Sequence, residues 1–138
     1  MNLAILSLAA ILITISLSAI LSRTQKPAKA SMPPKLTAAG KVIQVQVVNR
    51  SGVPGAAMQV TEYLRIQGYD VVEIATGRGQ PLVRSYVADR CGDSVRAAQL
   101  VKVLSLDSGH VRLERPSNAY VDFTVFVGRD LAKSVPAN

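Results

Sequence analysis

The sequence has very little of the chemistry that disulfides and metal sites require. Its 138 residues include one cysteine, Cys91, and one histidine, His110. A single cysteine cannot form a disulfide within the chain, and it has no second thiolate with which to hold a metal. We therefore expect no metal and no other cofactor. Cys91 does not indicate a compartment, because a single buried thiol is compatible with oxidising and reducing surroundings.

Aromatic residues are also scarce. Tryptophan is absent, and Tyr and Phe together number six. The net charge is +7, but residues 23–35 supply +4 of it, with four Lys or Arg and no acid. Residues 36–138 hold twelve Lys or Arg against nine Asp or Glu, a net charge of only +3. A nucleic-acid binder normally carries a dense basic surface with stacking aromatics, so the composition argues against nucleic acid as a partner.

No catalytic set of residues stands out, and we expect that the protein is not an enzyme. His110 falls in an expected turn, and neither a Cys nor a pair of acids lies close to it in the sequence. Asp89, Arg90 and Asp93 cluster at the end of an expected strand. A helix cap and a local ion pair explain this cluster more simply than acid–base catalysis does. A weak enzyme that uses Asp89 and His110 remains an alternative.

The longest hydrophobic run lies at the N-terminus, where residues 3–21 carry no charge. Nineteen helical residues span about 28 Å, which is enough for the core of a bilayer. A secretory signal has a shorter apolar run, about 7–15 residues, behind a positive segment that this chain lacks. We therefore expect residues 1–22 to form a retained single-pass transmembrane helix in a bacterial inner membrane. A cleaved signal peptide is the alternative.

One side of this predicted helix is small or weakly polar. Its members recur at spacings of three and four: Ala4, Ser7, Ala10, Thr14 and Ser18. Such a stripe lets a second membrane helix approach closely, so we predict partner-helix packing there. Hydroxyls that bond only to their own helix are the alternative. The positive flank follows the helix, and by the positive-inside rule this favours a cytoplasmic C-terminal domain.

The folded region is organised around residues 42–68. Their first part, VIQVQVVN, alternates apolar and polar residues with the period of two that is typical of a half-buried strand. A loop with two glycines and a proline follows, and then an apolar pattern at helical spacing that ends at Gly68. Residues 23–40, which precede this region, are rich in Pro, Ala, Lys and Ser and are typical of an extended linker.

The remaining pattern completes a small α+β domain. Strands are expected at residues 70–75, 82–89, 111–115 and 121–128, and a second helix, capped by Asp93, at residues 94–106. The order is β-α-β-β-α-β-β. We therefore predict a domain over residues 41–131 in which two helices pack on one side of a mixed sheet, with a tail at residues 132–138.

Three stretches carry a resemblance to a known family. They are VQVVNRSGVPGAAMQVTEYLRIQGYDVVEI (Val45–Ile74), SYVADRCGD (Ser85–Asp93) and VDFTVFVGRDL (Val121–Leu131). In this order and spacing the chain resembles the LytR C-terminal domain family over about residues 41–131. Domains of this family usually stand outside the inner membrane behind a membrane helix, often after a catalytic domain that attaches polymers to the cell wall. Residues 23–40 cannot form such a catalytic domain. The resemblance therefore implies a small accessory module of the envelope, in the periplasm or otherwise outside the cytoplasm. This location is opposite to the one that the positive-inside rule favours.

One loop is a candidate ligand site, formed by Asn49, Arg50, Ser51, Gly52 and Gly55. Free backbone N–H groups at the start of the expected helix could bind an anion there with the help of Arg50. The spacing matches neither the dinucleotide fingerprint nor a P-loop, and a plain connector between strand and helix is the simpler interpretation. We expect a membrane-anchored, non-catalytic interaction module, an accessory or assembly subunit whose partners are other membrane or envelope proteins. A glycan or wall-polymer binding module is the alternative.

Overall fold

The computed structural model describes residues 32–37 and 39–135. Its strands and α-helices are, in chain order, β1 (Gln44–Asn49), α2 (Ala56–Ile66), β2 (Asp70–Thr76), β3 (Tyr86–Asp89), α3 (Ser94–Val103), β4 (Val111–Leu113), β5 (Phe123–Val127) and α4 (Arg129–Ser134). A short 3-10 helix, η1 (Ser108–His110), precedes β4. The predicted order of strands and helices is confirmed, and α4 follows it as a further helix.

No helix in these described ranges is both long and apolar enough to cross a membrane. The predicted transmembrane segment, residues 1–22, lies outside the described residues, and so do residues 23–31 of the predicted linker.

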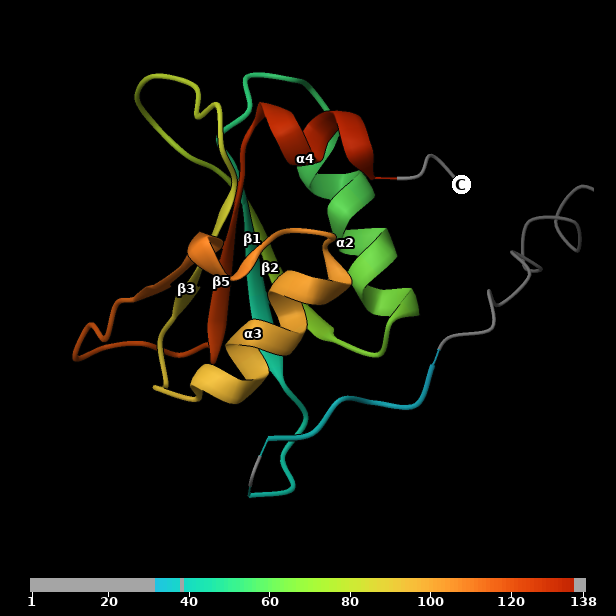
Figure 1. The fold of residues 1–138 in the computed structure, drawn as a ribbon, viewed down its shortest axis with the longest axis vertical. Helices are drawn as coiled ribbons and strands as arrows, with labels where there is room; N and C mark the ends of the chain where they lie inside the picture. The colour runs from blue at the N-terminus through green and yellow to red at the C-terminus, as the bar shows by residue number, and fades with distance from the viewer. Residues whose placement is uncertain (1–31, 38, 136–138) are drawn as a thin grey trace, which may run out of the picture. The chain divides into compact units, whose positions relative to one another are not determined.

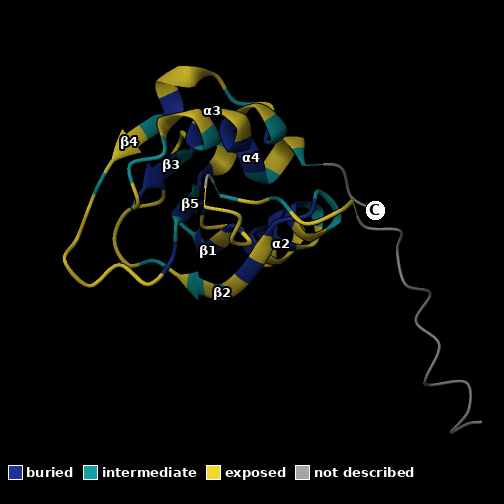
Figure 2. Ribbon diagram, turned by 90° about the horizontal axis from the view of Figure 1, so that it is seen from below, coloured by how far each residue is buried: buried dark blue, intermediate teal, exposed yellow. Residues whose placement is uncertain are grey.

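The strands form one mixed sheet in the order β2-β1-β5-β3-β4. Strand β1 is parallel to both of its neighbours, β2 and β5. Strand β3 is antiparallel to β5 and parallel to β4. Figure 2 shows the strands following one another in this order, with β2 and β4 at the two edges. The prediction of a mixed sheet is confirmed.

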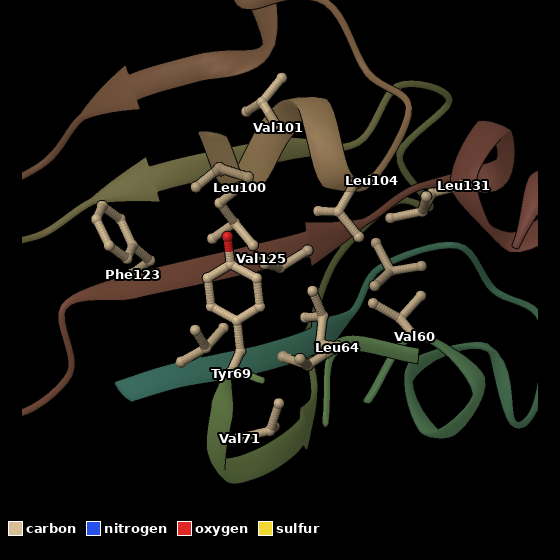
Figure 3. Packing of buried hydrophobic residues seen from close by; sticks show 14 of the residues in the cluster. Val60, Leu64, Tyr69, Val71, Leu100, Val101, Leu104, Phe123, Val125 and Leu131 are labelled. Atoms are coloured by element: carbon tan, nitrogen blue, oxygen red, sulfur yellow. The ribbon is translucent and has the colours of Figure 1, made fainter. Parts of the chain in front are cut away.

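The three α-helices lie on one side of this sheet (Figure 1). The alternation in β1 places Val45 and Val47 on that side, where both are fully buried. Helix α2 meets them with Val60 and Leu64, because apolar residues four apart lie on one face of a helix. Figure 3 shows these helices and strands meeting in a single core, which includes Tyr69, Val71, Leu100, Val101, Leu104, Phe123, Val125 and Leu131.

Two local features differ from the sequence-based expectation. Strand β3 begins at Tyr86 and not at Leu82, because the carboxylate of Asp130, and not a neighbouring strand, accepts from the backbone N–H of Ser85 (2.9 and 3.0 Å). Helix α4 lies where we expected the end of the domain and a tail. It has six residues and only Leu131 is buried, so it carries no periodic pattern that would mark it as a helix.

The end of the predicted linker, residues 32–37, lies against the domain. The backbone N–H of Met32 donates to the carbonyl oxygen of Ile66 at 2.7 Å. Gly68 makes this approach possible for two reasons. Its φ is +87°, and a Cβ at this position would lie 2.2 Å from the carbonyl oxygen of Pro33. Contacts of the folded domain therefore extend back to Met32.

Candidate functional site

The loop between β1 and α2, which is the candidate ligand loop, is closed by its own side chains. Asn49 Oδ1 accepts hydrogen bonds from the backbone N–H (3.1 Å) and the hydroxyl (2.8 Å) of Ser51. Asn49 Nδ2 donates to the carbonyl oxygen of Val53 at 2.8 Å. The Ser51 hydroxyl in turn accepts from the backbone N–H of Val53 at 3.0 Å. Asn and Ser side chains commonly close turns in this way. The polar atoms of Asn49 and Ser51 therefore hold the shape of the loop.

A hollow of about 310 Å³ lies beside this loop, at the carboxyl ends of β1 and β2. One wall is the β1–α2 loop, with Gly52 and Gly55, and the other is the β2–β3 loop, with Gly77 and Pro81. Helix α2 begins at this wall after Gly55, and no side chain caps it. The first backbone N–H groups of α2 are thus without a capping side chain, and these groups carry partial positive charge.

Arg50 bridges the two walls of the hollow. Its Nη2 donates to the carbonyl oxygen of Gln80 at 3.0 Å. A Cβ on Gly77 would lie 2.1 Å from Arg50 Cδ, so the side chain occupies space that only a glycine leaves open. Among the described residues, Arg50 Nε is buried without a hydrogen-bond partner, and no acid forms an ion pair with Arg50. An anionic group that entered the hollow would meet this cation.

The cluster at Asp89, Arg90 and Asp93 forms the turn between β3 and α3. Asp89 is 2% exposed, and its Oδ1 accepts from the backbone N–H groups of Cys91 (3.1 Å), Gly92 (2.6 Å) and Asp93 (3.3 Å). Asp93 caps α3, as predicted, because its Oδ1 accepts from the first-turn N–H that follows three residues later (3.1 Å). The carboxylates of Asp89 and Asp93 therefore act as acceptors for backbone N–H groups of the turn and of the start of α3.

The ion pairs that Asp93 and Arg90 form in the structure are with residues outside the cluster. The carboxylate of Asp93 pairs with Arg96 on the first turn of α3, at 3.0 Å. Arg90 reaches away from the turn and pairs with Glu114, after β4, at 3.1 Å. The interpretation of the cluster as a cap with an ion pair therefore holds for Asp93, whereas Arg90 has its acid partner elsewhere in the fold.

Asp130, the acid of the third motif, joins two strands to α4. Its carboxylate accepts from the backbone N–H of Ser85 with both oxygens, from the Ser85 hydroxyl (2.6 Å) and from the backbone N–H of Leu131 (2.7 Å). The Ser85 hydroxyl accepts in turn from the backbone N–H of Gly128 at 2.7 Å. Burial alone would raise the pKa of Asp130, but these hydrogen bonds outweigh it and hold the pKa below its ordinary value.

His110 is buried in η1 and has its own partners. Its Nε2 lies 3.3 Å from Arg84 Nη2, and its Nδ1 lies 3.1 Å from the carbonyl oxygen of Asp107. A guanidinium only donates, so Nε2 accepts and Nδ1 donates, which is the arrangement of a neutral imidazole. The alternative of an enzyme that combines Asp89 with His110 gains no support from these contacts, since each side chain is engaged with other groups.

Comparison with models of protein families gives a match that spans all three motifs. The model described as LytR cell envelope-related transcriptional attenuator matches residues 42–131, more than half of the chain. This chain belongs to the LytR C-terminal domain family. The resemblance inferred from the motifs is thereby confirmed, and the family description relates the domain to the cell envelope. No curated protein and no solved structure matches the chain.

The helix-free face of this LytR C-terminal domain carries a row of stacked side chains that the sequence did not indicate. The ring centroids of Tyr86 (β3) and Phe126 (β5) are 4.6 Å apart, with 18° between the ring planes. The guanidinium carbon of Arg112 (β4) lies 4.0 Å from the centroid of Tyr86. Phe126 and Arg112 therefore cover the two faces of Tyr86. The row stiffens the sheet, and both faces of the Tyr86 ring are already used within the domain.

A chain of hydrogen bonds crosses the same face nearer to the start of β1. The Tyr120 hydroxyl donates to the carboxylate of Glu73 on β2 and accepts from Gln46 Nε2 on β1 (3.1 Å). Gln46 Oε1 accepts from the Thr124 hydroxyl on β5 (3.2 Å), and Thr124 Oγ1 accepts from Arg90 Nε (3.2 Å). Gln46 is 74 positions from Tyr120 and 78 from Thr124, so no local pattern could have revealed the chain.

The residues predicted to pack against a partner helix lie outside the described part of the LytR C-terminal domain protein. They are Ala4, Ser7, Ala10, Thr14 and Ser18. Their role remains a prediction from the sequence.

Proposed function

We propose that this protein is a membrane-anchored, non-catalytic accessory or assembly subunit of a bacterial envelope complex, with its folded domain outside the cytoplasm. The proposal rests on what the side chains of the three sequence motifs do in the fold. Asn49, Asp89 and Asp130 each accept hydrogen bonds that close a turn or join two elements. Motif residues used in this way build a rigid surface that a partner can recognise. The membership in an envelope-related family supports the location.

The uncharged run at residues 3–21 supports the anchor, and its stripe of small residues supports contact with a partner helix. The test is the native mass of the full-length protein after extraction in mild detergent, with mass spectrometry of the proteins that accompany it. We expect a stoichiometric set of membrane proteins. A lone monomer or homodimer would contradict the accessory role.

The stripe itself is tested by replacing Thr14 and Ser18 together with leucine. This change keeps the helix apolar but fills the close-approach surface, so recovery of the accompanying proteins should fall. Ser16→Leu is the matched control, since in the predicted helix residue 16 would lie on the side opposite to residues 14 and 18. Equal recovery with the double variant and with the control would exclude helix packing as the mechanism.

The single cysteine tests the side of the membrane on which the domain lies. Cys91 is exposed in the folded domain. Partial burial of its thiol raises the pKa of that thiol, so labelling is best done at mildly alkaline pH. A membrane-impermeant maleimide should label Cys91 in cells with a permeabilised outer membrane, and a Cys91→Ser variant should stay unlabelled. Labelling only by a permeant maleimide would place the domain in the cytoplasm and refute the proposed location.

A second candidate function, binding of a wall polymer, is favoured by the hollow at Arg50. The hollow combines a cation that has no acid partner in the described residues with an uncapped helix start, which suits an anionic group of a polymer. Full-length protein in detergent should then sediment with purified wall material, and Arg50→Ala should reduce the bound fraction. Undiminished binding by Arg50→Ala would remove this hollow as the site.

A further inference from the structure

A groove lies on the helix-free face, beside the loop that joins β4 to β5. Its larger part, about 560 Å³, is lined by Gln44 and Asp122 among others, and its smaller part, about 140 Å³, includes Gln46. Arg90 and Tyr120 line both parts, so the two hollows are adjacent, and we describe them together as the groove. Figure 1 shows the β4–β5 loop, in orange, on the opposite side of the sheet from the helices. The larger part has the size of a typical ligand site, about 300–1,000 Å³.

We propose that this groove binds an envelope polysaccharide that is neutral or weakly anionic. Gln44, Gln46 and Arg90 would hydrogen-bond to its hydroxyl and acyl groups, and the ring of Tyr120 would pack on a sugar ring. The inference rests on the second candidate function, polymer binding, and places the polymer at a surface other than the Arg50 hollow. It does not depend on the accessory-subunit proposal.

The two glutamines reach the groove because of the register of β1. Residues 44 and 46 are two positions apart on one strand, so their side chains share a face. A primary amide offers both donors and an acceptor, as the hydroxyl groups of a sugar require. The backbone of Gln44 is held in place by Asp122, whose carboxylate accepts from Gln44 N–H (2.9 Å) and whose own N–H donates to Gln44 O (3.0 Å). Gln44 thus presents an exposed amide from a fixed backbone.

Arg90, which lines both parts of the groove, has N–H donors that are free, among the described residues, to bind a ligand. Its Nε donates to Thr124, and its Nη1 pairs with Glu114. Nη2 makes no hydrogen bond within the described residues, and 16% of the side chain remains exposed. The guanidinium is therefore held in one orientation by two contacts, while Nη2 is left to donate to a ligand oxygen.

Tyr120 presents an aromatic ring whose position is already set. The residue is 62% exposed, yet its hydroxyl is tied to Glu73 and to Gln46. The hydrogen bond to Glu73 raises the pKa of Tyr120 above its ordinary value, so the phenol stays neutral at physiological pH. A ring fixed in advance loses little conformational entropy on binding, and its negative face attracts the weakly positive C–H groups of a sugar ring.

The charges on this face favour a polysaccharide over a nucleic acid. Three carboxylates, those of Glu73, Glu114 and Asp122, lie along the same face as the groove. Lys41 and Arg90 line the same groove, so the charges are mixed and do not form the dense basic surface that a chain with a phosphate at every unit requires. A polyhydroxylated chain with few charges can instead donate to these carboxylates and accept from the amides and from Arg90.

The test uses full-length protein in detergent and three probes: purified peptidoglycan for sedimentation, chitohexaose as a soluble neutral polymer and polygalacturonate as a soluble anionic one. Tyr120→Ala should weaken binding about tenfold. Gln44→Ala should weaken it about threefold. Gln99→Ala, a glutamine exposed on α3, is the matched control and should bind like the parent protein. Tyr120→Phe keeps the ring, so it should bind better than Tyr120→Ala, and equal thermal unfolding midpoints would show that both variants are folded.

The outcomes separate the groove from the other proposals. Loss of binding in Arg50→Ala, with Tyr120→Ala and Gln44→Ala unchanged, would overturn the groove and keep polymer binding at the Arg50 hollow. Absence of binding by the parent protein to all three probes would overturn both polymer proposals, while the native mass of the complex would still decide the accessory role. Binding of single-stranded RNA in preference to all three probes would also overturn the inference.

Discussion

Replacing Asp130 with asparagine should loosen the junction between β3, β5 and α4. The carboxylate accepts from the backbone N–H and hydroxyl of Ser85 and from the backbone N–H of Leu131. Asparagine keeps one acceptor oxygen and sets an NH2 group against donors that faced the second oxygen. Hydrogen bonds to a charged group contribute about 1.5–3 kcal/mol each, and the remaining oxygen recovers part of the loss. We expect the free energy of unfolding at pH 7 to fall by about 2–3 kcal/mol.

The effect should depend on pH in a defined direction. The folded state lowers the pKa of Asp130, so the ionised carboxylate stabilises the fold at any pH above the pKa of the unfolded chain. This contribution is lost as the pH falls through the folded pKa. The difference in the free energy of unfolding between the parent and Asp130→Asn should therefore be full at pH 7 and shrink below about pH 4.

The assay is equilibrium unfolding in urea of the compact unit formed by residues 31–138. Asp107→Asn is the control, because it removes an acid near the same histidine, while its own carboxylate is mostly exposed and lies 3.5 Å from His110. That control should change the free energy of unfolding by less than about 0.5 kcal/mol. An Asp130→Asn effect below about 1 kcal/mol at pH 7, or one that persists unchanged in acid, would refute the reasoning.

Three further substitutions test other parts of the fold in the same assay. Thr61→Val should raise the free energy of unfolding by about 1 kcal/mol, because the Thr61 hydroxyl is fully buried without a partner among the described residues; a decrease would contradict this. Gly68→Ala should lower it by at least about 1 kcal/mol, since φ is positive and Cβ would strike Pro33, and hydrogen exchange at Met32 should become faster than in the parent. Asp93→Ala should lower it by about 1 kcal/mol through loss of the α3 cap, and no change would mean that the cap is replaced.

The sequence predicts the elements that depend on local pattern. The alternation around Val45 and Val47, the spacing of Val60 and Leu64 and the cap at Asp93 each act within a few residues, and each appears in the structure. The order of the strands was beyond this reasoning, because β5 inserts between β1 and β3 through contacts distant in sequence. The start of β3 was missed for the same reason, since it depends on one hydrogen-bonded pair, Ser85 and Asp130, 45 positions apart. Helix α4 was missed because its one buried residue, Leu131, gives no periodic pattern.

The candidate sites also divide into those with a local sequence pattern and those formed by residues distant in the sequence. The loop from Asn49 to Gly55 could be identified because its glycines and proline are contiguous, and the hollow lies beside it. The proposed polysaccharide groove could not, because Tyr120 sits in a polar loop with no pattern of its own. Its ring gains a fixed position only through Gln46 and Glu73, which belong to two other strands.

Strand β1 links the core to the proposed groove through a single register. Val45 and Val47 face the helices, and Gln44 and Gln46 face the opposite side. A slip of one residue would bury the glutamines and expose the valines, so burial of the valines strongly selects the present register. The same selection sets the position of Gln46 beneath Tyr120. The geometry of the groove is therefore fixed by the hydrophobic core on the other face of the strand. A core variant such as Val47→Ala should lower the free energy of unfolding, and polysaccharide binding should change only when the loss of stability is large enough to disturb the strand.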